Sequence, residues 1–265
     1  MPFATVNGVN LYYRIDAPPD GDAPWLVLSN ALGTDVSLWT PQIAAFSRRF
    51  RVLRYDARGH GRSSVPPGPY TIEQLCGDAL GLMDALAIER AHVCGISLGG
   101  VTAMALAARH GGRVGRLVDI SALPRNLAPR EVWLERMEQA RRGGMPTLAA
   151  ASVERWLSAA FRAQAPLIAE AIRDVVRHTD VEGYVASCAV VADTDLSQEV
   201  VRIAAPTLIV SGTHDAGFPV DEGRSLAARI PGARHVVFEA LHLPNVEQAA
   251  ALTQTVVGFL LLPPP

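Results

Sequence analysis

The stretch Val93-Cys94-Gly95-Ile96-Ser97-Leu98-Gly99-Gly100 guides the interpretation of the whole chain, because its Gly-x-Ser-x-Gly pattern joins two different kinds of segment. Residues 90–96 are short and apolar, as in a buried strand, and the Ala-, Leu- and Met-rich run 101–109 favours a helix. A sharp strand-to-helix turn of this kind exposes a serine hydroxyl at the start of the helix. Ser97 is therefore the predicted nucleophile. A glycine-rich helix start with a capping serine is the alternative.

Apolar, strand-like runs recur along the chain, each followed by a glycine-containing loop and a helical segment. They cover residues 25–29, 51–55, 92–96, 116–120, 207–210 and 235–238, and residues 3–15 add a hairpin that turns at Asn7-Gly8. Unbroken apolar runs that alternate with helices indicate a mostly parallel sheet covered on both faces. Together with the serine turn, this pattern predicts an α/β-hydrolase fold with a mostly parallel eight-stranded sheet flanked by helices.

The alternation breaks between about residues 123 and 200, where helical patterns rich in Arg, Glu, Trp and Ala replace it. We expect residues 123–200 to form a helical cap inserted after the sixth strand. The two parts of the core are then residues 1–122 and 201–265. Ligands bind outside the carboxyl ends of parallel strands, so a cap that starts there would cover the site.

Composition narrows the possible classes of function. The chain has 265 residues, 49% of them hydrophobic, and its net charge of −2 argues against nucleic acid as the main partner. The chain has 24 arginines and no lysine. The lack of lysine excludes Schiff-base chemistry, pyridoxal phosphate attachment and a P-loop lysine. Cys76, Cys94 and Cys188 lack C-x-x-C spacing, so they indicate reduced core thiols, and neither a metal site nor a disulfide.

The N-terminal segment is polar and strand-like, and no apolar run reaches about 18 residues. We therefore expect a cytoplasmic protein that acts on a small molecule and does not associate with a membrane. Monomer and homo-oligomer are both compatible with the sequence.

A serine nucleophile needs a base within hydrogen-bond reach and an acid that orients the base. His242 is the predicted base, because its loop follows the last predicted strand and can bring a side chain over the sheet edge. A loop histidine with a structural hydrogen bond is the alternative. His235 at a strand start, His110 at a helix end and His60 in a tight turn are the competing histidines.

Asp215 is the predicted acid, because it follows the apolar run 207–210 at the carboxyl end of a strand and gives the chain order serine, acid, histidine. The alternative is an Asx cap ahead of Pro219. Asp193 and Asp195 are the main competitors, but they precede the last two predicted strands.

Two backbone N–H groups are needed to hold the oxyanion that forms during attack on a carbonyl. Leu98 directly follows the nucleophile, and Leu32 lies in the loop after the third strand, so we expect their amides to form this hole. A plain strand-to-helix turn is the alternative for the Leu32 loop. The nearby segment 56–64 contains Asp, Arg and His, but its glycines and charged pairs favour a structural turn.

Several segments together resemble the 3-oxoadipate enol-lactonases nearly from end to end. They are residues 29–35, 55–61, 65–70, 84–92 and 242–248, with 131–133, 141–144 and 154–156 in the expected cap. The most particular are Asn30-Ala31-Leu32-Gly33-Thr34-Asp35 and Pro66-Pro67-Gly68-Pro69-Tyr70. The resemblance implies hydrolysis of a five-membered enol-lactone with an acetate side chain to 3-oxoadipate, in aromatic catabolism. No metal or organic cofactor is implied.

The free carboxylate of such a substrate needs a cation, and arginine binds carboxylates through a planar two-point fork. The expected cap offers arginines at 125, 130, 136, 141, 142, 155 and 162. Arg136 lies three residues after Trp133, on the same helical face, so these two are the predicted substrate-binding pair. Trp156 is added from the family-like segment 154–156. The alternative is a solvated arginine beside tryptophans that pack the cap onto the core.

Two other classes of function remain open. One is a different serine hydrolase with the same triad, such as an esterase or a carbon–carbon bond hydrolase. The other is a receptor-like α/β-hydrolase that only binds a small ligand, which the complete triad disfavours.

Overall fold

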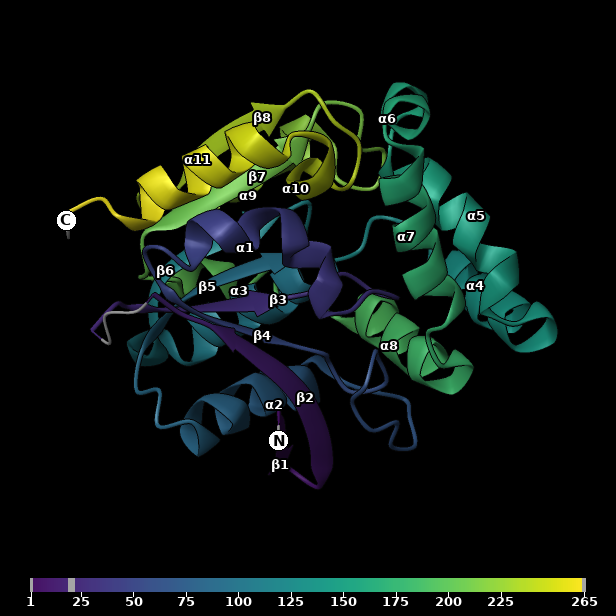
Figure 1. The fold of residues 1–265 in the computed structure, drawn as a ribbon, viewed down its shortest axis with the longest axis horizontal. Coiled ribbons are helices and arrows are strands. Elements are labelled where there is room, and N and C mark those ends of the chain that lie inside the picture. Colours follow the sequence, from purple (N-terminus) through teal and green to yellow (C-terminus); the bar gives the residue numbers. More distant parts are fainter. Residues whose placement is uncertain (1, 19–21, 264–265) are drawn as a thin grey trace.

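The computed structural model describes residues 2–18 and 22–263 (Figure 1). Eight strands form one sheet in the order β1-β2-β4-β3-β5-β6-β7-β8. They are β1 (Phe3–Val6), β2 (Val9–Asp16), β3 (Trp25–Ser29), β4 (Arg51–Tyr55), β5 (Ala91–Ile96), β6 (Val114–Ile120), β7 (Thr207–Gly212) and β8 (Arg234–Phe238). β2 pairs antiparallel with β1 and β4, and all other neighbours are parallel. The predicted fold class is confirmed.

The core helices cover both faces of the sheet. They are α1 (Thr40–Phe46), α2 (Ile72–Ala85), α3 (Leu98–Arg109), α9 (Val220–Arg229), α10 (Pro244–Glu247) and α11 (Ala249–Leu260), with short 3-10 turns at Val36–Trp39, Gly111–Arg113 and Val200–Arg202. Figure 1 shows α1 and α11 on one side of the sheet and α2 on the other. No helix within the described ranges combines the length and the apolar composition that a membrane crossing requires.

The element bounds follow the sequence pattern closely. Asn7 and Gly8 have φ values of 50° and 75°, as the two-residue turn of a β-hairpin requires. The main difference is at α3, which begins at Leu98 and not at residue 101. Leu98 and the two glycines after it are wound into the first turn of this helix, although glycine has a low helix propensity.

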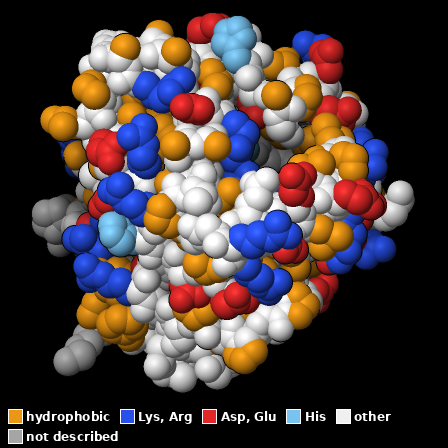
Figure 2. Space-filling model, turned by 90° about the vertical axis from the view of Figure 1, so that its right-hand side faces the viewer, with side chains coloured by type: hydrophobic (Ala, Val, Ile, Leu, Met, Phe, Trp, Pro, Cys, Tyr) orange, Lys and Arg blue, Asp and Glu red, His pale blue; other side chains and the backbone are white. Residues whose placement is uncertain are grey.

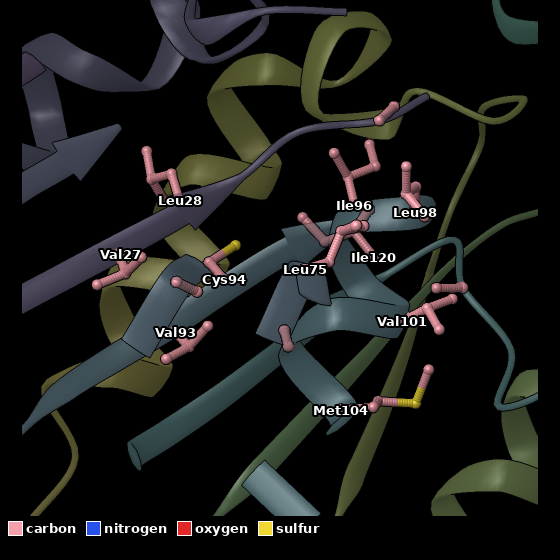
Figure 3. Close-up of a cluster of buried hydrophobic side chains, with 14 of the residues drawn as sticks. Val27, Leu28, Leu75, Val93, Cys94, Ile96, Leu98, Val101, Met104 and Ile120 are labelled. Carbon is pink, nitrogen blue, oxygen red and sulfur yellow. The ribbon is translucent and has the colours of Figure 1, made fainter. Parts of the chain in front are cut away.

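The hydrophobic core lies around the central strands. Leu28 of β3, Cys94 of β5 and Ile120 of β6 are each 0% exposed, and Figure 3 shows them beside side chains of α3. Close packing of this kind tolerates little displacement, so the carboxyl ends of these strands are rigid supports for a site. All three cysteines are buried and free, as expected.

Five helices between β6 and β7 form the cap, on the right of Figure 1. They are α4 (Arg130–Gly143), α5 (Met145–Trp156), α6 (Ala159–Gln164), α7 (Pro166–Arg177) and α8 (Val181–Asp193). At the base of the cap, the Leu196 amide donates to the Pro124 carbonyl at 2.7 Å, so the segments that enter and leave it lie side by side. The limits 123 and 200 stay a prediction.

The cap helix α8 contacts the core through backbone alone at one point. A Cβ added to Gly183 would lie 2.2 Å from the carbonyl oxygen of Gly59, in the turn after β4. The Tyr70 amide also donates to the Ala186 carbonyl of α8 at 3.1 Å. This helix is therefore held against the core more closely than a side-chain contact would allow.

Candidate active site

The turn between β5 and α3 holds Ser97 in a conformation that few residues adopt. Ser97 has φ 56° and ψ −120°, outside the regions that L-residues favour. A Cβ on Gly95 would lie 2.0 Å from the Gly99 carbonyl oxygen, and one on Gly99 would lie 2.2 Å from the carbonyl oxygen of Ser29. Only glycine fits at these two positions. The turn therefore carries Ser97 at the N-terminus of α3, as the sequence predicts.

Asp215 and His242 form a hydrogen-bonded pair beyond the carboxyl ends of β7 and β8. Asp215 Oδ2 lies 2.6 Å from His242 Nδ1, and Asp215 Oδ1 accepts the amides of Gly217 at 2.9 Å and Phe218 at 3.2 Å. Burial alone would raise the pKa of Asp215, but its interaction with His242 and these hydrogen bonds outweigh burial and hold the pKa below its usual value. Asp215 is therefore a carboxylate bound to Nδ1 of the imidazole, and His242 Nε2 has no hydrogen-bond partner among the described residues.

All eight predicted site residues line one cavity of about 410 Å³. They are Leu32, Ser97, Leu98, Trp133, Arg136, Trp156, Asp215 and His242. Within the described part of the chain, Ser97 and His242 share this cavity without a direct hydrogen bond. Catalytic hydrogen bonds often shorten only in the complex with substrate, so the arrangement is compatible with a serine–histidine pair.

The two predicted oxyanion donors belong to two separate segments that line the cavity. Leu98 is the first residue of α3, where backbone N–H groups lack a partner within the helix and the helix dipole is positive. Leu32 lies in the loop after β3. A hydrogen bond to the segment 56–64 fixes this loop, because the Gly33 amide donates to His60 Nε2 at 2.9 Å. The segment 56–64 thus supports the loop after β3 and has a structural role, as its sequence predicts.

Two of the three competing histidines and both competing aspartates are engaged elsewhere, and the third histidine, His110, is not among the residues that line the cavity. His60 is buried, which lowers its pKa, and it accepts the hydrogen bond from Gly33. His235 Nε2 lies 2.7 Å from Ser211 Oγ. Asp193 pairs with Arg130 at 2.7 Å, and Asp195 accepts the Ser197 amide at 2.8 Å. None of these four is among the residues that line the cavity.

The cap contributes aromatic rings and a fixed guanidinium to the cavity. Arg136 donates from Nε to the Tyr184 hydroxyl and from a terminal nitrogen to Ser152 Oγ at 3.0 Å. Its guanidinium carbon lies 5.9 Å from the centre of the Trp133 ring. Trp156 stacks on His242, with ring centres 6.4 Å apart. The three predicted substrate-binding residues are thus oriented by other side chains.

The cap arginines divide into two groups by their partners. Those bonded to carboxylates are Arg130 with Asp193, Arg141 with Glu182, Arg142 with Glu138, Arg162 with Glu154, Arg173 with Glu170 and Arg177 with Asp174. Among the described residues, Arg125, Arg136 and Arg155 form no salt bridge, and these three line the cavity. Figure 2 shows a hollow on this face with basic side chains beside it. The cavity is therefore lined by three guanidinium groups that form no salt bridge with a carboxylate in the described part of the chain.

Comparison with known proteins agrees with this geometry. Residues 24–249 match the model of the alpha/beta hydrolase fold family. The chain belongs to the α/β-hydrolase family. Among its relatives, 3-oxoadipate enol-lactonase 2 of Acinetobacter baylyi is 35% identical over 90% of this chain and 89% of the relative. The crystal structure of the enol-lactonase from Burkholderia xenovorans LB400 is 52% identical, has a TM-score of 0.96, and covers 98% of this chain and 99% of that chain.

The similarity to enol-lactonases confirms the resemblance seen in the sequence, and it identifies this α/β-hydrolase as a carboxylic ester hydrolase. A protein of Caulobacter sp. strain K31 whose name describes a carbamate hydrolase, RutD, is 32% identical over 88% of this chain and 88% of that protein. The family is therefore established, whereas its members differ in the substrates that their names describe.

Sequence reasoning named Arg155 of this α/β-hydrolase only as one of several cap arginines, and it did not find Tyr184. Arg155 is one of the unpaired arginines, and its guanidinium lies 3.3 Å from Ser152 Oγ, which Arg136 also contacts. Because Arg155 directly precedes Trp156, a predicted substrate-binding residue, the sequence could have indicated that it lies near the cavity. Tyr184, which holds Arg136, lies 48 residues away along the chain, and no spacing rule would pair them.

Proposed function

We propose that the protein is a serine hydrolase that opens 3-oxoadipate enol-lactone to 3-oxoadipate through an acyl-enzyme. The observation that supports this most directly is the shared cavity, where Ser97 and the Asp215–His242 pair meet arginines without acidic partners. The enol-lactonase relatives indicate the same reaction. A role in aromatic catabolism and a cytoplasmic location belong to this proposal.

In the first step, Ser97 Oγ attacks the lactone carbonyl while His242 Nε2 takes its proton. Asp215 stabilises the imidazolium that forms and keeps its proton on Nδ1. The amides of Leu98 and Leu32 donate to the oxyanion. When the tetrahedral intermediate collapses, the ring oxygen leaves as an enolate, which takes the proton from the His242 imidazolium and becomes a ketone, so that His242 is a neutral base again. Because the enolate is stabilised, ring opening is easier than loss of an ordinary alkoxide.

In the second step, His242 removes a proton from water, and the hydroxide attacks the acyl carbon on Ser97. The same two amides hold the second oxyanion. Collapse returns the proton to Ser97 and releases a product that carries one more carboxylate than the lactone. The protein needs no other chemical group for either step.

The arginines of the cavity account for the acidic side chain of this substrate. Arg136 is oriented by Tyr184 and Ser152, so its planar fork is ordered before substrate binds. A carboxylate in this cavity gains charge-assisted hydrogen bonds and charge neutralisation, whereas a neutral ester or a neutral carbamate ester gains only ordinary hydrogen bonds. The cavity charge therefore favours an anionic lactone over a neutral ester or carbamate ester.

Two measurements test this function. The first is labelling of Ser97 by a fluorophosphonate, detected by peptide mass spectrometry, which tests the nucleophile without assuming a substrate. The second is kcat/KM for 3-oxoadipate enol-lactone, p-nitrophenyl acetate and a small alkyl carbamate. We expect labelling at Ser97 and the highest kcat/KM for the enol-lactone. Higher kcat/KM for either neutral compound would contradict the proposed substrate.

A further inference from the structure

We propose that Glu247, at the end of α10, is a positioning residue that couples the cap to His242. This inference rests on the proposed function, in which His242 is the base. Glu247 lies five residues after His242 and points back toward the loop that carries it. The proposed chemistry assigns this carboxylate no task.

The carboxylate of Glu247 joins two segments of different parts of the molecule. One oxygen accepts the amide of Leu241, the residue before His242, and the other accepts the amide of Ser158 in the cap, both at 2.6 Å. Hydrogen bonds from backbone N–H groups to a carboxylate are among the stronger kinds in proteins. A single side chain therefore sets the distance between the histidine loop and the junction of α5 and α6.

A second contact joins the same two segments directly. The amide of Leu243, the residue after His242, donates to the carbonyl of Trp156 at 3.2 Å. The ring of Trp156 also stacks on the His242 imidazole at 27°. His242 is thus flanked on both sides by backbone amides that are bonded either to the cap or to the side chain that holds the cap.

The position of the cap therefore determines the direction of the His242 imidazole. Asp215 fixes one ring nitrogen, but the backbone of the loop must also place Nε2 within reach of Ser97. A displacement of about 1 Å at a catalytic group can cost a factor of about 10² in rate. Loss of the Glu247 carboxylate should lower the chemical rate of each folded active site, beyond any effect on stability.

The first experiment compares Glu247→Gln with the control Glu239→Gln. An amide can accept only one of the two N–H groups that Glu247 accepts. Glu239 precedes Leu241 in the same loop, but its side chain is 72% exposed and accepts no bond from the cap; it contacts His214, an exposed residue that also lines the cavity. Active sites are titrated with a fluorophosphonate, and the maximal rate with p-nitrophenyl acetate is divided by the titrated concentration to give kcat per site. We expect a loss of about tenfold for Glu247→Gln, with KM changed less than twofold, and no loss for Glu239→Gln.

The second experiment breaks the link from the cap side. Ser158 has φ −59° and Leu157 before it is extended, so the backbone accepts proline at position 158. Ser158→Pro removes the N–H that Glu247 accepts. Ser158→Ala is the matched control, because it keeps this N–H and removes only the hydroxyl that accepts the Phe161 amide. We expect Ser158→Pro to lower kcat per titrated site severalfold and Ser158→Ala to leave it unchanged.

A positioning role and a structural role differ in these measurements. A structural role lowers the melting temperature or the number of titrated sites but leaves kcat per site unchanged. Unchanged kcat per site in Glu247→Gln would overturn the proposal, whether or not Ser158→Pro folds. A double variant no slower than the slower single variant would support it. If wild-type Ser97 is not labelled, the serine mechanism itself fails. Normal labelling with unchanged variants overturns only the role of Glu247.

Discussion

The turn at Ser97 and the cap above it are held by different kinds of interaction. The turn depends on backbone atoms in contact, where a single methyl group at Gly99 would meet a carbonyl at 2.2 Å. The outer cap depends on side-chain ion pairs such as Arg142 with Glu138, whose side chains are 77% and 58% exposed. Exposed pairs contribute about 0 to 1 kcal/mol each. Backbone contacts in the core thus fix the position of Ser97, whereas charged residues on the outer cap can be substituted with little loss of stability.

The sharpest test of this division is Ser97→Ala. It removes one oxygen from a turn that the backbone already forms, so activity should fall by about 10³-fold or more while stability stays the same. The control is Ser121→Ala, because Ser121 lines the same cavity and its buried hydroxyl has no hydrogen-bond partner among the described residues. Folded Ser97→Ala protein that kept a tenth of the wild-type turnover would show that the core residue is misassigned.

The activity losses caused by substituting Ser97, His242 and Asp215 should not add. We expect His242→Ala to cost about as much as Ser97→Ala, and Asp215→Asn somewhat less, because Asp215 orients the base without taking the proton. The double variant Ser97→Ala/His242→Ala should be no slower than either single variant. Steady-state kinetics on the purified variants measure these losses, and circular dichroism spectra that match the wild type show that each variant is folded. Additive losses would mean that the two side chains act independently.

The cap is tested by its selectivity. Arg136→Leu should lower kcat/KM for 3-oxoadipate enol-lactone by an amount equal to about 2 to 5 kcal/mol, the usual cost of losing one partner of a desolvated charged pair. It should leave p-nitrophenyl acetate nearly unaffected. Arg142→Leu serves as the control, because this arginine is exposed and already paired with Glu138. Equal losses on the two substrates would mean that Arg136 has a structural role. Arg155 or Arg125 would then be the candidate for binding the substrate carboxylate.

The backbone contact in the core predicts a loss of stability for Gly99→Ala. The added methyl group cannot fit against Ser29 without movement of the turn, and such overpacking typically costs about 1 to 3 kcal/mol. Gly112→Ala is the matched control, since a Cβ there meets no atom within 4 Å. Urea unfolding of both variants gives the difference. A Gly99→Ala variant as stable as Gly112→Ala would show that the turn is softer than its geometry indicates.

The smallest expected effect is in the pH dependence of stability. The pKa of Asp215 is lowered in the folded state, so its carboxylate adds stability above its ordinary pKa of about 4. This contribution is lost as the pH falls through the folded-state pKa. The difference in unfolding free energy between wild type and Asp215→Asn should therefore shrink from pH 7 to pH 3. Thermal or urea unfolding at several pH values measures it, and a constant difference would contradict the lowered pKa.

The parts of the molecule that sequence predicts well are those governed by local pattern. The order of strands, the turn at Ser97 and the loops of Asp215 and His242 follow from apolar runs and what comes directly after them. The pairing of cap arginines does not, because Arg141 and Glu182 are 41 residues apart on different helices. Glu247 gave no signal either, since its partners are backbone amides, which every residue except proline carries.

The backbone contact between Gly59 and Gly183 has a consequence for the engineering of this enzyme. A side chain at either position would push α8 away from the core, so both positions must stay glycine. Helices α4 and α5, which carry the cavity arginines Arg136 and Arg155, have no such restriction at this contact. New substrate preferences are therefore best sought by exchanging segments of α4 and α5 while α8 is kept. The contact between the cap and the core then stays the same.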